Sequence, residues 1–248
     1  MKIEDYIKSL PENIISGESV QIPNNALREI LEFAKIGKRD IFYHLGCGDS
    51  AGPAIAAEYG AHAIGIDTDA EKIKIAKKIH GHSKATYECK NVLDADISDA
   101  TIVFFWFTDE EIVDAITKKA CNVKPGCKII TVWSPLPRCL PNKVQFPFML
   151  HTAPFLKAKS LSEQILHVFG VKCIDFSTAW EHAERYTRAI QPPNAENNRL
   201  VTIIQTLIIW INAKNAKIAC GDQIPEPVKS YMDILRNCYN IETRHLLN

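Results

Sequence analysis

The stretch that decides the fold runs from Ile41 to Asp69 and reads IFYHLGCGDSAGPAIAAEYGAHAIGIDTD. An apolar run enters the turn Gly46-Cys47-Gly48, a small-residue helix pattern follows, and a second apolar segment ends at Asp67. This order predicts a β-α-β unit that presents backbone amides after its first strand and a carboxylate after its second. Glycine allows positive φ and close approach to a ligand, and an acid at the second strand end suits ribose hydroxyls. We therefore expect the unit to bind a small molecule that contains adenosine.

Two cofactors are compatible with this unit. The dinucleotide fingerprint G-x-G-x-x-G/A fits Gly46, Gly48 and Ala51, with Asp67 about 20 residues further on, as NAD sites require. S-adenosylmethionine would use the same glycine turn and the same acid for its ribose. A lone G-x-G turn is weak evidence for either cofactor, so the surrounding sequence has to distinguish them.

The surrounding sequence favours S-adenosylmethionine. The segments LGCGDS and AIGIDTDAEKIKIAKK resemble motifs I and II of class I S-adenosylmethionine-dependent methyltransferases. Residues 22–36, residues 91–103 and the turn Lys124-Pro125-Gly126 are similar to segments of the archaeal broad-specificity protein-lysine methyltransferases. The resemblance covers roughly residues 20 to 155. It implies a methyltransferase fold and activity, with S-adenosylmethionine as cofactor and protein lysine as a substrate. A small-molecule acceptor stays open.

Two departures from the family pattern concern the first motif. His44 stands where the family has an acid that contacts the methionine amino group, and Ser50 stands where GCGDG has its last glycine, with Gly52 shifted downstream. A histidine is mostly uncharged near pH 7 and holds an ammonium less well than a carboxylate. These departures keep open a non-catalytic binding or scaffold protein on a degenerate methyltransferase fold. An NAD-dependent oxidoreductase is the other alternative, although no Tyr-x-x-x-Lys constellation is evident.

The resemblance assigns the cofactor contacts to residues at strand ends. Gly46, Cys47 and Gly48 would cradle the methionine part, Asp67 the ribose, and Asn91 with Val92 the adenine. The candidate cofactor-binding residues are His44, Gly46, Cys47, Gly48, Asp67, Thr68, Asn91, Val92 and Phe105.

The methyl acceptor is expected at the ends of the fourth and fifth strands, at the carboxyl edge of the sheet. Methyl transfer depends on positioning and on exclusion of water, so catalytic residues stay unassigned. Aromatic side chains there would suit a lysine stem and its charge. Asp109 also fits the N-cap of the next helix, and Phe105 and Phe107 also fit the core. The absence of a D/N-P-P-Y motif argues against nucleobase methylation. The candidates for the acceptor pocket are Trp106, Thr108, Asp109, Trp133 and Ser134.

Composition restricts partners and compartment. Basic and acidic residues both total 29, so no net field attracts nucleic acid or an anionic membrane. The eight cysteines form no C-x-x-C pair, which favours free thiols in a reducing compartment. The first residues lack a signal-peptide core, and the apolar stretch Val201 to Ile211 is too short to span a bilayer. The histidines lack metal-site spacing. We expect a cytoplasmic protein with no metal site, whose partner is a protein or small-molecule methyl acceptor.

Alternating strand and helix patterns predict an α/β fold: a doubly wound, mostly parallel Rossmann-like sheet with an antiparallel edge hairpin and a helical C-terminal extension. We expect a methyltransferase-like domain with N-terminal helices over residues 1–158 and a mainly helical extension packed on it over 159–248. A helix over 195–214 is apolar on so much of its circumference that it must be covered on more than one side. A homo-oligomer through these helices is one way to cover it. The strands are expected at 41–45, 63–66, 85–89, 101–107, 128–133, 144–150 and 171–176.

Overall fold

The computed structural model describes residues 22–190 and 198–247. The chain divides after Ala158, and the residues on either side form two compact units. The short helix expected within residues 1–21 and the first residues of the helix expected from 195 lie outside the described part. The packing of the second unit on the first stays a prediction.

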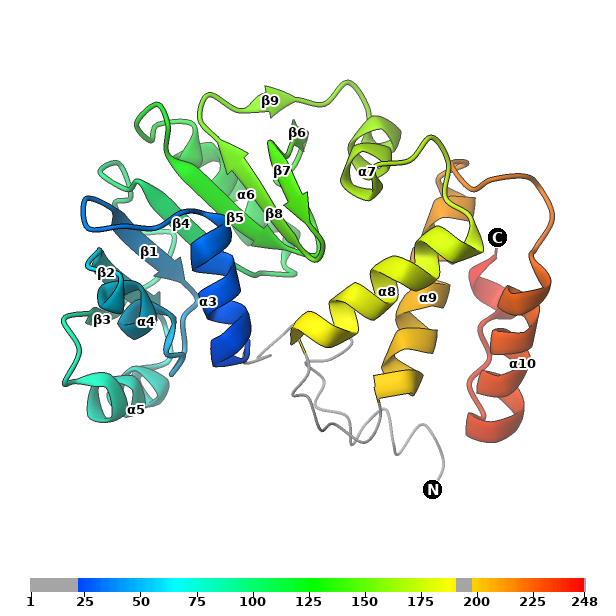
Figure 1. Ribbon diagram of the computed structural model, residues 1–248, viewed down its shortest axis with the longest axis horizontal. Helices are drawn as coiled ribbons and strands as arrows, with labels where there is room; N and C mark the ends of the chain where they lie inside the picture. The colour runs from blue at the N-terminus through cyan, green and yellow to red at the C-terminus, as the bar shows by residue number, and fades with distance from the viewer. Residues whose placement is uncertain (1–21, 191–197, 248) are drawn as a thin grey trace. The chain divides into compact units, whose positions relative to one another are not determined.

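The first unit is built on a seven-stranded sheet with the order β3-β2-β1-β4-β5-β8-β7 (Figure 1). β3, β2, β1, β4 and β5 run parallel, β8 runs antiparallel to β5, and β7 runs antiparallel to β8. A separate two-stranded sheet pairs β6 with β9. This arrangement confirms the doubly wound fold with an antiparallel edge. The strands are β1 Ile41–Leu45, β2 His62–Asp67, β3 Thr86–Cys89, β4 Ile102–Phe105, β5 Lys128–Val132, β6 Cys139–Leu140, β7 Lys143–Gln145, β8 Phe148–Thr152 and β9 Leu156–Lys157.

Helices cover both faces of the sheet. On one face, α5 (Ala70–His80) packs Ile73 and Ala76 against Tyr87 of β3, and α4 (Gly52–Glu58) lies with α3 (Asn24–Phe33) in front of the sheet in Figure 1. On the other face, α6 (Glu110–Ala120) joins a core cluster with side chains of β1, β2, β4 and β5. Because both faces are covered, β1 and β4 are almost wholly buried. This burial explains their continuous apolar sequences.

Three expected strands differ from the structure. The strand expected over 144–150 is two strands, β7 and β8, because Pro147 has no N–H for the ladder and lies in the turn between them. The strand expected over 101–107 ends at Phe105, where the chain leaves the sheet. The strand expected over 171–176 was wrong, since this segment forms only an isolated bridge between Ile174 and Ala219 before α8 begins.

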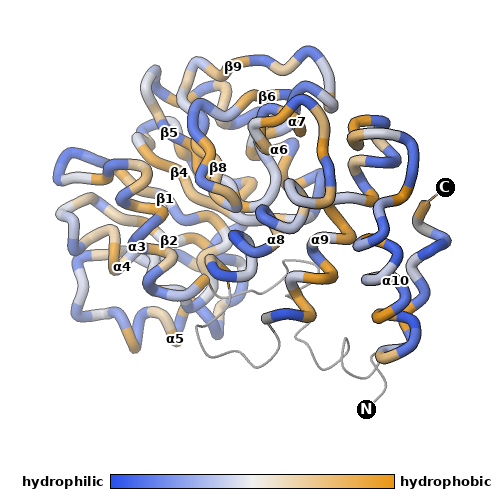
Figure 2. Tube along the Cα trace, turned by 45° about the vertical axis from the view of Figure 1, so that its right-hand side comes forward, coloured by the Kyte–Doolittle hydropathy of each residue, from blue (hydrophilic) through white to orange (hydrophobic). Residues whose placement is uncertain are grey.

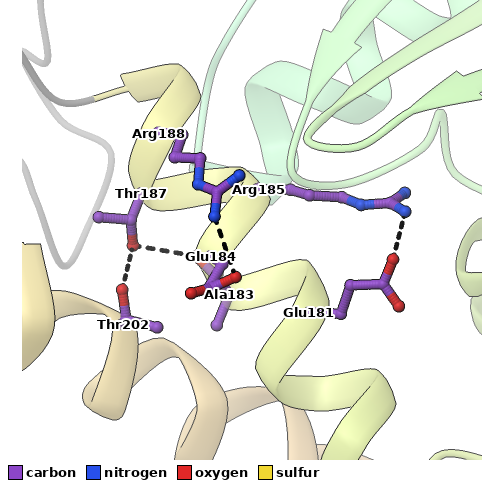
Figure 3. Close-up of polar contacts among 7 residues, drawn as sticks. All are labelled: Glu181, Ala183, Glu184, Arg185, Thr187, Arg188 and Thr202. Atoms are coloured by element: carbon purple, nitrogen blue, oxygen red, sulfur yellow. Dashed lines mark hydrogen bonds and ion pairs between the residues drawn. The ribbon is translucent and has the colours of Figure 1, made fainter. Parts of the chain in front are cut away.

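The second unit is helical, as expected, and is organised around α9 (Figure 2). Helix α9 packs against both α8 and α10, and buried residues occur around most of its circumference. Its buried Thr202 hydroxyl donates to the Thr187 hydroxyl of α8 at 3.0 Å, which donates in turn to the Ala183 carbonyl at 2.9 Å (Figure 3). The expectation that this helix is covered on more than one side is confirmed. The helices are α7 Leu161–Phe169, α8 Phe176–Ile190, α9 Asn198–Asn215 and α10 Glu226–Tyr239, followed by a 3-10 turn, η1 Arg244–Leu246.

A disulfide joins Cys173 to Cys220 in this unit. The expectation that all cysteines are free thiols was therefore wrong for this pair, because the two residues are 47 positions apart and only the fold brings them together. The bridge connects the chain before α8 to the chain after α9, next to the Ile174–Ala219 pairing. The other six cysteines, all within the described residues, form no disulfide.

Replacing both bridged cysteines (C173S/C220S) should destabilise the helical unit by up to about 4 kcal/mol, because a cross-link over this separation restricts the unfolded chain. Urea unfolding monitored by far-ultraviolet circular dichroism measures the loss. The variant C89S/C121S removes two free, exposed cysteines and serves as the control, with expected changes within about 0.5 kcal/mol. An unchanged unfolding midpoint in C173S/C220S would contradict a stabilising bridge.

Candidate active site

The candidate site lies where β1, β2 and β4 end, at the point where the strand order reverses between β1 and β4. Such switch points form the ligand crevice of open α/β sheets. The turn after β1 has positive φ at Gly46 (72°) and Gly48 (53°), which side chains other than glycine rarely adopt. A Cβ on Gly46 would lie 2.7 Å from Cζ of Phe107. The turn therefore requires glycine both for its backbone and because the Phe107 ring lies directly on it.

Hydrogen bonds fix this turn to the end of β2. The N–H groups of Gly46 and Cys47 donate to the Ile66 carbonyl at 2.8 and 3.1 Å. The Gly48 N–H donates to Oδ2 of Asp67 at 2.7 Å, and the Asp69 N–H donates to Oδ1 at 2.9 Å. These amides bond within the protein, contrary to the expectation that they face a ligand. What the turn offers is a backbone surface without Cβ atoms and a carboxylate held beside it.

The two departures from the family pattern meet in space. The His44 side chain is only 6% exposed, and a Cβ on Gly52 would lie 2.6 Å from its Nδ1. The Gly52 N–H donates to the Ser50 hydroxyl at 3.1 Å, and the Tyr87 hydroxyl donates to the Ser50 carbonyl at 3.2 Å. The imidazole at position 44 thus needs glycine at position 52, and serine at position 50 satisfies that glycine's amide. His44, Ser50 and Gly52 of the altered motif therefore fit one another by packing and hydrogen bonding.

Electrostatics at the turn come from two carboxylates rather than from His44. Burial lowers the pKa of His44 to about 3, so the ring is neutral at pH 7. Its Nδ1 has no hydrogen-bond partner among the described residues. Burial first, then the charges of Asp67 and Asp49, raise the pKa of the Cys47 thiol, which places both acids near the turn. The sequence candidates omitted Asp49, although it is the acid of GCGD. The negative charge at the turn therefore comes from Asp67 and Asp49.

The remaining cofactor candidates differ in accessibility. Asn91 is exposed, and its Oδ1 accepts the Leu93 N–H at 2.9 Å in a turn after β3. Thr68 is exposed directly after Asp67. Val92 and Phe105 are 6% and 2% exposed and belong to the core cluster of the sheet. The accessible candidates on this side are therefore Asn91 and Thr68. Val92 and Phe105 are buried in the core and are not exposed to a ligand.

The acceptor candidates lie after β4 and β5, parallel neighbours whose carboxyl ends share one edge. Trp133 has φ 69°, an outlier for so bulky a residue, of the kind that often occurs at functional sites. The backbone N–H of Trp133 donates to the Pro147 carbonyl at 2.8 Å, and the ring centroids of Trp133 and Phe146 are 5.5 Å apart. Trp106 is half-buried. The structure thus places Trp133, with its positive φ, and the half-buried Trp106 at this edge.

The polar candidates on this edge have unequal roles. Asp109 caps α6, since its Oδ1 accepts the N–H groups of Glu111 and Ile112 at 2.8 and 3.1 Å. This is the capping role that the sequence pattern favours for it. Thr108 and Ser134 are exposed. Phe107, for which the sequence also favoured a core position, is half-buried, packs against the core cluster and stacks on Phe105 with 5.9 Å between ring centroids. It belongs to the site through its contact with Gly46.

Comparison with known proteins decides the family. No family model matches the chain. A protein-lysine N-methyltransferase of Saccharolobus islandicus (strain REY15A) is 30% identical over 118 residues, which cover 45% of this chain and 73% of that enzyme. The chain belongs to the family of this enzyme, the class I S-adenosylmethionine-dependent methyltransferases. An RNA methyltransferase of Salinibacter ruber, solved with S-adenosyl-L-homocysteine, shares the fold at 24% identity with a TM-score of 0.52, covering 57% of this chain and 99% of that one.

The chain is therefore an S-adenosylmethionine-dependent methyltransferase. The family assignment favours this activity over the nicotinamide and scaffold alternatives. Within residues 22–190 and 198–247, no group of three or more His, Cys, Asp or Glu side chains is arranged to hold a metal ion. No described helix is long and apolar enough to cross a membrane.

Gly52→Ala should destabilise the methyltransferase by about 1–3 kcal/mol, because its Cβ would collide with the His44 ring. In a His44→Ala background the same substitution should cost much less, which a double-mutant cycle of urea unfolding measures. Gly37→Ala is the matched control, since a Cβ there lies 3.9 Å from its nearest neighbour. An equal cost of Gly52→Ala with and without the imidazole would contradict the pairing.

The burial of His44 should also make stability depend on pH. Its pKa of about 3 in the folded protein lies below its value of about 6.5 in the unfolded chain, so the unfolded state takes up the proton first. The contribution of neutral His44 to the free energy of unfolding is fully present above pH 6.5. As the pH falls toward 3, it declines by at most about 1.4 kcal/mol per pH unit. His44→Leu should flatten the dependence measured by urea unfolding between pH 7 and 4. Substituting the exposed His62 by Leu is the control, and an identical slope in wild type and His44→Leu would refute the assignment.

Proposed function

We propose that this methyltransferase transfers the methyl group of S-adenosylmethionine to the side-chain amine of lysine in a protein substrate. The observation that carries the proposal is the relationship to the archaeal enzyme, which is named for this activity. The balanced charge of the chain gives no general attraction for nucleic acid. A small-molecule acceptor is the alternative substrate, and it would bind at the same edge of the sheet, after β4 and β5. Pairing of two copies through the C-terminal helices stays a prediction.

The residues around the glycine turn fit the proposed cofactor. Of the two turn glycines, Gly48 is the more open toward the methionine part, since a Cβ there would meet only Cδ of Lys72 at 3.4 Å, whereas the Phe107 ring covers Gly46. Asp67 lies at the end of β2, where its oxygens keep lone pairs for ribose hydroxyls although each already accepts one backbone N–H. Asp49 takes the place of the missing acid at position 44 as the partner of the methionine ammonium. Asn91 and Thr68 are the accessible residues for the adenosine part.

The acceptor edge fits a lysine side chain. Trp106 and Trp133 provide aromatic surface for the aliphatic stem and for the positive charge of the amine before it loses its proton. When bound, the cofactor supplies an electrophilic methyl group on a sulfonium. A lysine amine that has first lost a proton to solvent would present its lone pair to that methyl group. The contribution of the chain is to align the amine and to exclude competing water.

Asp67→Asn should weaken S-adenosylmethionine binding by roughly tenfold or more, because hydrogen bonds to a charged group contribute about 1.5–3 kcal/mol. Calorimetric titration measures this loss, and a labelled methyl donor with a mixture of acceptor proteins measures the activity. Wild type should yield radioactive methyl-lysine after acid hydrolysis, and Asp67→Asn should yield less at limiting cofactor.

Glu58→Gln is the control, since it also converts a carboxylate to an amide but lies at the far end of α4, in an exposed ion pair with Arg28. It should leave cofactor binding unchanged. Binding of NAD⁺ but not S-adenosylmethionine would refute the assigned cofactor. Transfer of label to small molecules but never to protein would refute the assigned acceptor.

A further inference from the structure

Three aromatic rings gather in the helical unit, which contains none of the candidate site residues described above. Phe176 and Trp180 come from the first turns of α8, and Tyr231 comes from the beginning half of α10 (Figure 1). The ring centroids of Phe176 and Trp180 are 6.5 Å apart, with planes 22° from parallel. The Tyr231 ring lies 5.5 Å from Phe176 and 5.9 Å from Trp180, inclined by 64° and 50°. The three rings thus form two walls that meet at an angle.

The cluster is open to solvent and its polar groups have no protein partner. All three residues are partly exposed, so the rings keep an accessible side. Within the described part of the chain, neither the Trp180 indole N–H nor the Tyr231 hydroxyl makes a hydrogen bond. Partly buried tyrosine and tryptophan usually find such a partner. Two unused donors beside three rings indicate a surface built for contact with another molecule.

The chemistry of the cluster suits a weakly hydrated cation. Aromatic faces attract cations within about 6 Å of the ring centroid, and rings grouped in this way bind quaternary ammonium groups. Asp175 precedes Phe176, and its carboxylate accepts the Thr178 N–H at 2.7 Å, which lowers its pKa and keeps it charged. Arg185, one turn beyond Trp180, is held in an ion pair with Glu181 (Figure 3). The cation of α8 that follows Trp180 is therefore paired, and the residue before Phe176 carries a negative charge.

We propose that Phe176, Trp180 and Tyr231 bind the methylated ammonium group of a lysine side chain. Methylation removes N–H donors and weakens hydration of the cation, so the methylated form costs less to move onto the rings. The identity of this ligand rests on the proposed function, since methyl-lysine is the product of that reaction. A product-binding surface would give the enzyme a second attachment to a protein that carries several lysines.

The test compares two peptides that differ only in charge. One carries trimethyl-lysine, and the other carries the uncharged analogue in which carbon replaces the nitrogen. Wild type should bind the charged peptide about fivefold more tightly by calorimetric titration. Trp180→Leu and Tyr231→Leu should each reduce this preference, whereas Trp180→Phe, which keeps a ring, should retain most of it. Tyr239→Leu, another tyrosine substitution on α10, is the control and should leave the preference unchanged.

Equal affinity of wild type for the two peptides would overturn the inference, as would an undiminished preference in both leucine variants. Thermal unfolding of each variant verifies that the helical unit is intact. Cofactor affinity and lysine methylation are measured on the same proteins. Equal affinity of wild type for the two peptides, with cofactor binding and lysine methylation intact, refutes the ammonium site alone. A preference retained in wild type that methylates no lysine refutes the proposed function and supports the site.

Discussion

The hydrogen bond from the Gly48 N–H to the Asp67 carboxylate is the constraint on which the candidate active site depends. Together with the bonds from Gly46 and Cys47 to the Ile66 carbonyl, it ties the turn after β1 to the end of β2. It uses an amide that would otherwise be free to bind a ligand, and it fixes a carboxylate at the crevice. The rest of the site follows, since Phe107 lies on the Cβ-free surface that this turn creates.

The unusual first motif is maintained by steric fit rather than by charge. A buried neutral imidazole on β1 cannot hold an ammonium by charge, yet it is matched to Gly52 at the start of α4. The negative charge of the turn therefore comes from Asp49 and Asp67, whose fields both act on Cys47. The turn of this chain thus carries negative charge although its first strand has His44 in place of the acid.

The helical unit has its own means of stabilisation. A chain of hydroxyl hydrogen bonds joins α8 to α9, so the buried hydroxyls of Thr187 and Thr202 are satisfied within the protein. The disulfide from Cys173 to Cys220 closes the segment that contains both helices. With these constraints the unit displays three aromatic rings on α8 and α10, a surface that the methyltransferase fold does not require.

The sequence by itself determined the fold class and the main features of the glycine turn at the candidate site. The glycine turn and Asp67 could be read directly because backbone conformation and strand ends are encoded locally, in residue types and their spacing. Only the tertiary structure decided which distant residues meet: His44 with Gly52, Phe107 with Gly46, and Cys173 with Cys220. It also divided the segment around Pro147 into two strands and placed Val92 and Phe105 in the core. Such outcomes depend on packing between elements far apart in the chain, which local patterns do not contain.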